Sequence, residues 1–141
     1  MADPEKLRAF LEEKRNVIVG GVRADGRPHL TPNWFFYDGE RFYVSTMKPR
    51  AKYAIFRRDP RAELLVDDAT GFRAVMVSGR AEVWEDLRQG LPYFRAIRSK
   101  YGRPMPDDDE KLLADLEDEQ RFLLVVVPDD PSSEWPSWGL D

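Results

Sequence analysis

Cysteine is absent from the 141 residues, and histidine occurs once, as His29. Without thiols the chain can form no disulfide, no thiolate nucleophile and no cysteine-ligated metal centre. One histidine also argues against a zinc site, which draws its ligands mostly from cysteine and histidine. We therefore expect no metal, and any catalysis must come from other chemistry.

Long apolar runs and an excess of basic charge are also lacking. No stretch approaches the roughly 20 apolar residues of a membrane-spanning helix, and the first residues have no apolar run of the signal-peptide type. We expect a cytoplasmic protein that does not act at a membrane. Lysine and arginine number 22 against 26 acidic residues, a net charge of −4. Nucleic acid is not expected as a partner, because its binding needs a basic surface.

The composition that is present indicates one ordinary globular domain. Hydrophobic residues make up 42% and charged residues 34% of the chain, which suits a folded protein with a single core. We expect one domain over residues 1–141, in which the Pro- and Ser-rich segment 129–141 forms a loop-like tail.

Alternating apolar patterns and turn signals predict six strands, at 16–23, 28–37, 41–46, 61–68, 73–86 and 121–128. Helical spacing predicts helices near 4–15, 49–58, 87–101 and 112–116. Gly79, in the middle of the fifth strand, suggests a bulge or a sharp bend. Antiparallel hairpins with short helices between them indicate a small closed or nearly closed barrel with helices packed outside.

The stretch "STMKPRAK" places three cations, Lys48, Arg50 and Lys52, where the second helix begins. The first turn of a helix is already partly positive, so these cations are unfavourable unless an anion joins them. Ser45 and Thr46 end the preceding strand. Strand hydroxyls, helix N–H groups and basic side chains at one corner predict a phosphate site. The alternative is a solvated helix end.

The second informative segment is "PHLTPNWFFY". Period-2 alternation puts His29, Thr31 and Asn33 on one face and apolar residues such as Leu30 and Trp34 on the other. If the apolar set packs into the barrel, the polar set faces a cleft in which a flat heterocycle could bind. The alternative is an edge strand whose polar residues lie in water.

Trp135 and Trp138 lie in the tail, where exposed indoles are unexpected. The tail is therefore expected to dock. It either packs on its own barrel or closes over a pocket of a partner subunit.

Four segments together resemble the pyridoxamine-phosphate-oxidase-like, FMN-binding split β-barrel superfamily. They are "VRADGRPHLTPNWFFYDGERFYVST", "RAKYAIFRRDPRAELLVDD", "VSGRAEVWED" and "RFLLVVVP". The chain is most similar to the branch that uses the deazaflavin coenzyme F420. The resemblance implies a mainly β fold, a six-stranded antiparallel split β-barrel with short helices outside.

The resemblance also implies the site and the partners. The cofactor phosphate would be held by Ser45, Thr46, Lys48, Arg50 and Lys52, and the ring would lie along Thr31, Pro32, Asn33 and Trp34. Members of the superfamily are homodimers with two cofactor sites at the interface.

The activity that the resemblance implies is hydride transfer from reduced coenzyme F420 to a small unsaturated or conjugated substrate. No catalytic side chain is identified, since the cofactor carries the chemistry. The alternatives are an FMN-dependent oxidase or reductase and a non-catalytic protein that binds a flavin-like cofactor or a tetrapyrrole. Vitamin B6 oxidation is not expected, because the chain lacks the basic strand residue and the C-terminal arginine and histidine of the true oxidases.

Overall fold

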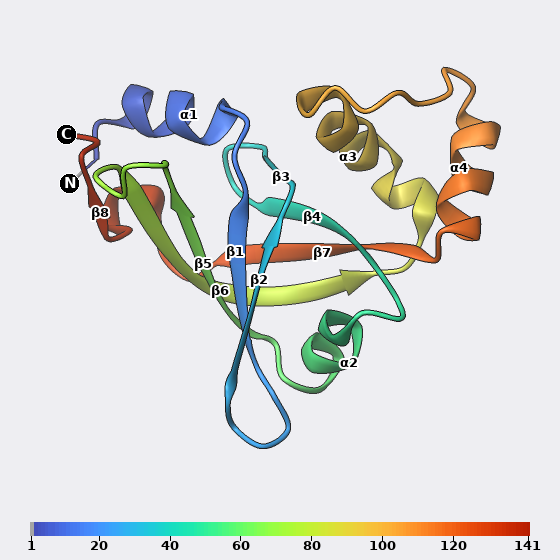
Figure 1. Ribbon diagram of the computed structural model, residues 1–141, viewed down its shortest axis with the longest axis horizontal. Coiled ribbons are helices and arrows are strands. Elements are labelled where there is room, and N and C mark those ends of the chain that lie inside the picture. Colours follow the sequence, from blue (N-terminus) through green and yellow to red (C-terminus); the bar gives the residue numbers. More distant parts are fainter. Residues whose placement is uncertain (1) are drawn as a thin grey trace.

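The computed structural model describes residues 2–141 and shows one curled antiparallel sheet with helices around it (Figure 1). The sheet order is β2-β1-β5-β6-β7-β4-β3, and β8 pairs with β6. The strands are β1 (Val17–Val22), β2 (Pro28–Asn33), β3 (Phe35–Tyr37), β4 (Phe42–Met47), β5 (Arg61–Asp67), β6 (Ala74–Trp84), β7 (Arg121–Pro128) and β8 (Ser137–Trp138).

The barrel is split between β2 and β3. These strands follow each other in the sequence with only Trp34 between them, yet they lie at opposite ends of the sheet order. The chain itself therefore crosses from one edge of the sheet to the other. The predicted split β-barrel is confirmed, but the count of six strands is wrong. The single strand predicted at 28–37 is two strands, and the tail contributes β8.

The helices are α1 (Pro4–Glu12), α2 (Ala51–Arg58), α3 (Leu87–Lys100) and α4 (Asp109–Asp118). Each of α1, α3 and α4 begins at an aspartate whose carboxylate accepts hydrogen bonds from first-turn N–H groups, as expected of a good N-cap. In the described part of the chain, no helix is both long enough and apolar enough to cross a lipid bilayer.

Two apolar clusters hold these elements together. One fills the barrel and includes Phe35, Phe42 and Phe122. The other, which includes Tyr43 and Phe94, lies between the outer face of β4 and β7 and the helices α3 and α4. β4 and β7 therefore have buried side chains on both faces.

Two glycines fix how neighbouring elements approach. A Cβ atom on Gly21 of β1 would lie 2.7 Å from Cζ of Phe56 and 2.9 Å from Cγ2 of Ile55, so only glycine lets α2 pack this closely against the sheet. Gly79 lies where β6 passes from pairing with β5 to pairing with β7. A Cβ there would lie 2.6 Å from the carbonyl oxygen of Val127. The strand runs through Gly79 without interruption.

The tail packs on its own barrel. Trp135 is 6% exposed and its ring lies 5.7 Å from that of Phe42, in the barrel cluster. The backbone N–H of Asp3 donates to the carbonyl of Leu140 at 2.8 Å, which ties the two ends of the chain together. Trp138 lies in β8, and its indole N–H donates to the carbonyl of Gly71 at 3.1 Å.

A candidate anion-binding pocket in the split of the barrel

The split between β2 and β4 widens into a pocket. Phe35 of β3 pairs with Val44 of β4. If this register continued, Trp34 would face Ser45 and Asn33 would face Thr46, but within residues 2–141 β2 pairs only with β1. The two strands therefore diverge beyond Phe35. A cavity of about 560 Å³ occupies the space between them.

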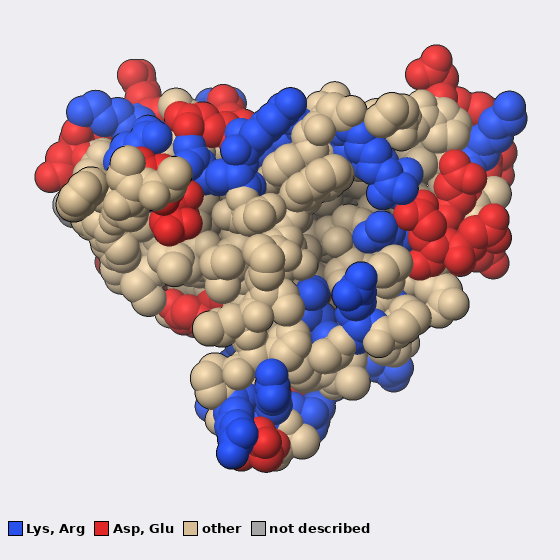
Figure 2. Space-filling model, in the orientation of Figure 1, with Lys and Arg blue, Asp and Glu red and all other residues tan. Residues whose placement is uncertain are grey.

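The cavity brings together most of the residues that the sequence predicts for the cofactor site. It is lined by residues of β2, β4, the start of α2 and the start of β7, namely His29, Thr31, Pro32, Asn33, Ser45, Thr46, Met47, Arg50, Ala51, Lys52 and Arg121. Three of these side chains are cationic and none is a carboxylate. Figure 2 shows Lys and Arg atoms inside a hollow beside α2, while Asp and Glu atoms gather over α4. The lining therefore carries an excess of positive charge, which makes the pocket a candidate site for an anion.

Lys52 is the most deeply placed of these cations. It is only 5% exposed, and its Nζ donates to Oγ1 of Thr31 at 3.0 Å. Burial lowers the pKa of Lys52, and the nearby charge of Arg50 lowers it further. Within residues 2–141 it has no carboxylate partner. A buried ammonium group of this kind is costly unless an anion neutralises it.

Thr31 links the two walls of the pocket. Its hydroxyl oxygen accepts from Nζ of Lys52 at 3.0 Å and from Nδ2 of Asn33 at 3.1 Å. A hydroxyl has two acceptor lone pairs and one proton. With both lone pairs occupied, the proton of Thr31 is free to point at a ligand. Asn33 itself is turned toward Thr31, since Nδ2 also donates to the Thr31 carbonyl at 2.8 Å.

The start of α2 adds backbone donors to the pocket. Arg50 is the N-cap residue but makes no side-chain cap, although Ser, Thr, Asp and Asn are the preferred residues there. The first N–H groups of a helix have no partner within the helix, and Ala51 and Lys52 line the cavity. Among the residues that the structure describes, the Arg50 guanidinium forms no ion pair. This corner can bind a phosphate or a carboxylate.

Two predicted site residues lie outside the pocket. Nζ of Lys48 lies 3.3 Å from Oε1 of Glu85, and both residues line a neighbouring cavity of about 690 Å³. The indole of Trp34 stacks on the ring of Tyr101, with centroids 4.7 Å apart and planes at 2°.

Leu30 and Trp34, on the apolar face of the segment 28–37, do not pack into the barrel, so the condition that the sequence set for a cleft on the polar face is not met. Leu30 is 64% exposed and Trp34 is 41% exposed. The reason is that β2 is an edge strand of a split barrel, so Leu30 is not covered by the apolar core and does not line the pocket. The polar face is half-buried and contributes His29, Thr31 and Asn33 to the pocket. Burial, followed by the charge of Lys52, lowers the pKa of His29.

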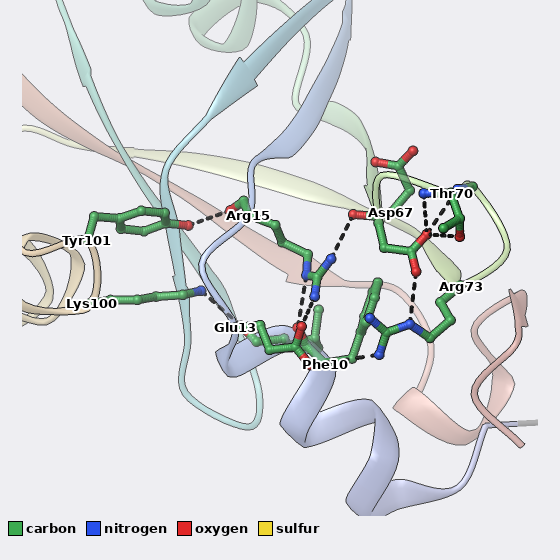
Figure 3. Close-up of polar contacts among 11 residues, drawn as sticks. Phe10, Glu13, Arg15, Asp67, Thr70, Arg73, Lys100 and Tyr101 are labelled. Atoms are coloured by element: carbon green, nitrogen blue, oxygen red, sulfur yellow. Dashed lines mark hydrogen bonds and ion pairs between the residues drawn. The ribbon is translucent and has the colours of Figure 1, made fainter.

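The end of α3 fixes the point at which the walls diverge. Figure 3 shows Tyr101 and Lys100 reaching from α3 toward Arg15 and the end of α1. The Tyr101 hydroxyl accepts from the N–H of Phe35 at 3.2 Å and donates to the carbonyl of Arg15 at 2.6 Å. Nζ of Lys100 donates to the carbonyls of Phe35 at 3.1 Å and Leu11 at 2.9 Å. Both the N–H and the carbonyl of Phe35, the residue after Trp34, are thus hydrogen-bonded to the end of α3.

Arg121, at the start of β7, is a pocket residue that the sequence did not reveal. Its Cα is paired with that of Met47, and its Nη1 lies 3.5 Å from Oγ of Ser45. In the sequence it is only the basic first residue of an otherwise apolar strand. The pairing of β7 with β4, across more than seventy residues, brings it to the pocket.

A larger cavity of about 780 Å³ lies between α1, α3 and the β3–β4 turn. Its charged residues are balanced, with Arg8 and Lys100 against Glu12 and Asp38. The cavity of about 560 Å³ in the split is the better candidate site, because its cations have no acidic counterpart on its lining.

The fold and the pocket together define a split β-barrel protein with a cation-lined pocket at the split. The model of the pyridoxamine 5'-phosphate oxidase family matches residues 3–128, and the chain belongs to this family. The match covers all the strands of the barrel except β8.

Several solved structures share this fold. The conserved hypothetical protein Rv2991 from Mycobacterium tuberculosis is 25% identical, with a TM-score of 0.81 over 98% of this chain and 85% of that one. A protein described as F420 reductase is 23% identical, with a TM-score of 0.68 over 87% and 93% of the two chains. HutZ, the heme storage protein from Vibrio cholerae, is 15% identical, with a TM-score of 0.76 over 99% and 97%.

Proposed function

We propose that the protein is an oxidoreductase that uses reduced coenzyme F420 to reduce a small unsaturated or conjugated substrate. The observation that carries this proposal is the pocket in the split, where Arg50, Lys52 and Arg121 face a cavity with no carboxylate on its lining. Membership of the family supports a flavin-type oxidoreductase. The fold shared with an F420 reductase supports the deazaflavin form of the cofactor.

The residues of this chain would bind and orient the cofactor. Arg50, Lys52 and the first N–H groups of α2 would hold its phosphate. The strand from Thr31 to Asn33 would lie along the ring, and the free hydroxyl proton of Thr31 would donate to a ring or side-chain oxygen of the cofactor. When bound, reduced coenzyme F420 supplies the hydride. The protein then needs no side chain as an obligate acid or nucleophile.

The proposal includes a cytoplasmic homodimer with the cofactor sites at its interface. Leu30 of β2 and Trp34, which directly follows this strand, form an exposed apolar face next to the pocket. Exposed apolar surface of this kind is typical of an interface. A second subunit on this face would cover it and would lie next to the cofactor.

The direct test is a parallel fluorescence titration of the purified protein with coenzyme F420 and FMN, followed by turnover with reduced F420 and a panel of activated alkenes and quinones. Binding of F420 with substrate-dependent oxidation of its reduced form is the expected result. Retention of FMN through dialysis, with no binding of F420, would establish the FMN-dependent alternative. Tight binding without turnover of either cofactor would indicate a carrier protein.

A further inference from the structure

Three arginines meet at one carboxylate beside the pocket. Oε2 of Glu119 lies 3.1 Å from Nη2 of Arg98, while its Oε1 lies 3.1 Å from Nη2 of Arg103 and 3.2 Å from Nη2 of Arg121. Three guanidinium groups therefore share a single negative charge. Although burial alone would raise the pKa of Glu119, hydrogen bonds from Arg103 and Arg98 hold it below the ordinary value. The carboxylate is fixed in its charged form.

Burial makes the excess positive charge significant. The side chain of Arg98 is 6% exposed and that of Arg121 is 18% exposed, whereas Arg103 reaches 38%. Burial lowers the pKa of Arg121, and the pairing with Glu119 opposes that change. An arginine remains protonated under ordinary conditions. A buried cation that shares its counter-ion with two others is stabilised by a further anion.

The pairing with Glu119 also orients Arg121. Nε and Nη2 of Arg121 donate to Oε1 of Glu119 at 3.3 Å and 3.2 Å. Nη1 is directed away from this pair and lies 3.5 Å from Oγ of Ser45, on the lining of the pocket. A planar guanidinium held on one side presents its remaining N–H groups in a fixed direction. Here that direction is the cavity.

The backbone around this pair is tightly constrained. Glu119 is the C-cap of α4, and Gln120 follows in the left-handed region with φ of 56°. This conformation is unusual for a residue with a side chain. The Gln120 carbonyl accepts from the N–H of Lys48 at 2.9 Å, and Arg121 then enters β7 opposite Met47. The turn at Gln120 thus connects the end of β4 to Arg121, the third cation of the pocket.

We propose that Arg121 binds an anionic substituent of the cofactor directly, and that Glu119 is the positioning residue that aims its guanidinium into the pocket. This inference deepens the proposed function and rests on the same pocket, but it does not depend on which ring is bound or on turnover. The chemistry recognised is a phosphate, or a carboxylate attached near it. Arg50 and Lys52 would contact the same anionic end of the cofactor from the opposite wall.

The test compares ligands that share a ring but differ in the anion. One pair is FMN and riboflavin, and the other is coenzyme F420 and its deazaflavin fragment without the phosphate. Dissociation constants are measured by fluorescence for wild type, Arg121→Gln and the matched control Arg103→Gln. Arg103 pairs with the same carboxylate but lines neither of the two cavities that Arg121 lines.

We expect Arg121→Gln to weaken binding of the phosphate-bearing ligand by about tenfold or more and to leave binding of the phosphate-free ligand within about twofold. Arg103→Gln should leave both within about twofold. Arg121→Lys should recover part of the loss, because it keeps the charge but not the fixed fork of donors.

Glu119→Gln separates positioning from simple charge. Removing a negative charge next to the pocket should tighten anion binding if charge alone matters. If Glu119 positions Arg121, the variant should instead bind FMN or F420 several-fold more weakly, with the phosphate-free ligands unchanged. Circular dichroism and melting curves confirm that the variants fold.

Three results would overturn the inference. In the first, Arg121→Gln loses the same affinity for the phosphate-bearing and the phosphate-free ligand. In the second, Arg121→Gln and Arg103→Gln change the affinities equally, and in the third the wild type does not prefer the phosphate-bearing ligand of either pair. A failure of F420 turnover alone would count against the proposed function and not against this role of Arg121.

Discussion

The cations of this protein fall into two groups with different surroundings. In the network of Figure 3, at the end of α1, Arg15 pairs with Glu13 and donates to the carbonyl of Asp67 at 3.2 Å. Arg73 lies 2.9 Å from Oδ2 of Asp68. In the split of the barrel, by contrast, Arg50 and Lys52 have no carboxylate partner within residues 2–141.

The difference separates cations that stabilise the fold through ion pairs from cations that are available to bind a ligand. Those in the first group have their partners on the same chain, and Arg15 also stacks over the Phe10 ring at 4.2 Å. Within residues 2–141, the ammonium group of Lys52 in the second group donates its one side-chain hydrogen bond to the hydroxyl of Thr31. Burying a charge without a counter-charge lowers stability. Sites that keep such a charge are candidates for function.

The largest expected effect comes from removing the unpaired cations. Lys52→Met and Arg50→Ala should each weaken binding of FMN or coenzyme F420 by about tenfold to a hundredfold, because each loses a charge-assisted contact with the phosphate. The melting temperature of Lys52→Met should stay the same or rise, since a buried ammonium is removed. Titration and thermal melts measure both. Unchanged affinity in both variants would show that the anion binds elsewhere.

Removing the hydroxyl of Tyr101, in the network of Figure 3, should change the stability of the fold more than the affinity for the ligand. Tyr101→Phe leaves the N–H of Phe35 and the carbonyl of Arg15 without their partner, at a cost of about 1–3 kcal/mol in the free energy of unfolding. Urea denaturation measures this cost. Tyr53→Phe is the matched control, because its hydroxyl contacts the half-exposed Glu85. Equal stability of the two variants would contradict the structural role of Tyr101.

Lys100 gives the network a dependence on pH. Burial lowers its pKa from 10.5 to about 8. Between these pH values the unfolded chain holds a proton that the folded chain has released, so raising the pH favours the folded state. From about pH 8 to pH 10, the free energy of unfolding of the wild type should therefore rise relative to that of Lys100→Met. If the free energies of unfolding of the two proteins change in parallel with pH, the pKa of Lys100 is not lowered by the fold.

The smallest effect is expected at Lys48, which the sequence places in the phosphate site but the structure pairs with Glu85. Both side chains are more than 40% exposed, so the pair contributes at most about 1 kcal/mol. Lys48→Gln should change cofactor affinity by no more than about twofold. A tenfold loss would place Lys48 with Arg50 and Lys52 and would move it from the first group of cations to the second.

Local sequence patterns were sufficient for much of this molecule. Alternation and turn residues predicted the strands, and helical spacing predicted the helices, because each pattern follows directly from the geometry of its element. The cluster at Arg50 and Lys52 was visible for the same reason, since a strand end and a helix start are adjacent in the chain. The hydrogen bond from Lys52 to Thr31 was not predicted, because the two residues belong to different elements.

Features set by long-range pairing were not predictable. Trp34 interrupts what looks like one continuous strand, and only the pairing of β2 and β3 with different partners reveals the break. Arg121 is brought to the pocket by the register of β7 on β4. The exposure of Leu30 depends on where the sheet ends, and nothing in the local alternation tells an inward face from an outward one.

Trp34 alone links β2 to β3, so the two walls of the split meet at one end. The walls are joined at Phe35 and Val44, and Arg50 and Lys52 line the pocket at the start of α2. We expect a ligand with a flat end and a charged end to place its charged end near α2, where Arg50 and Lys52 line the pocket.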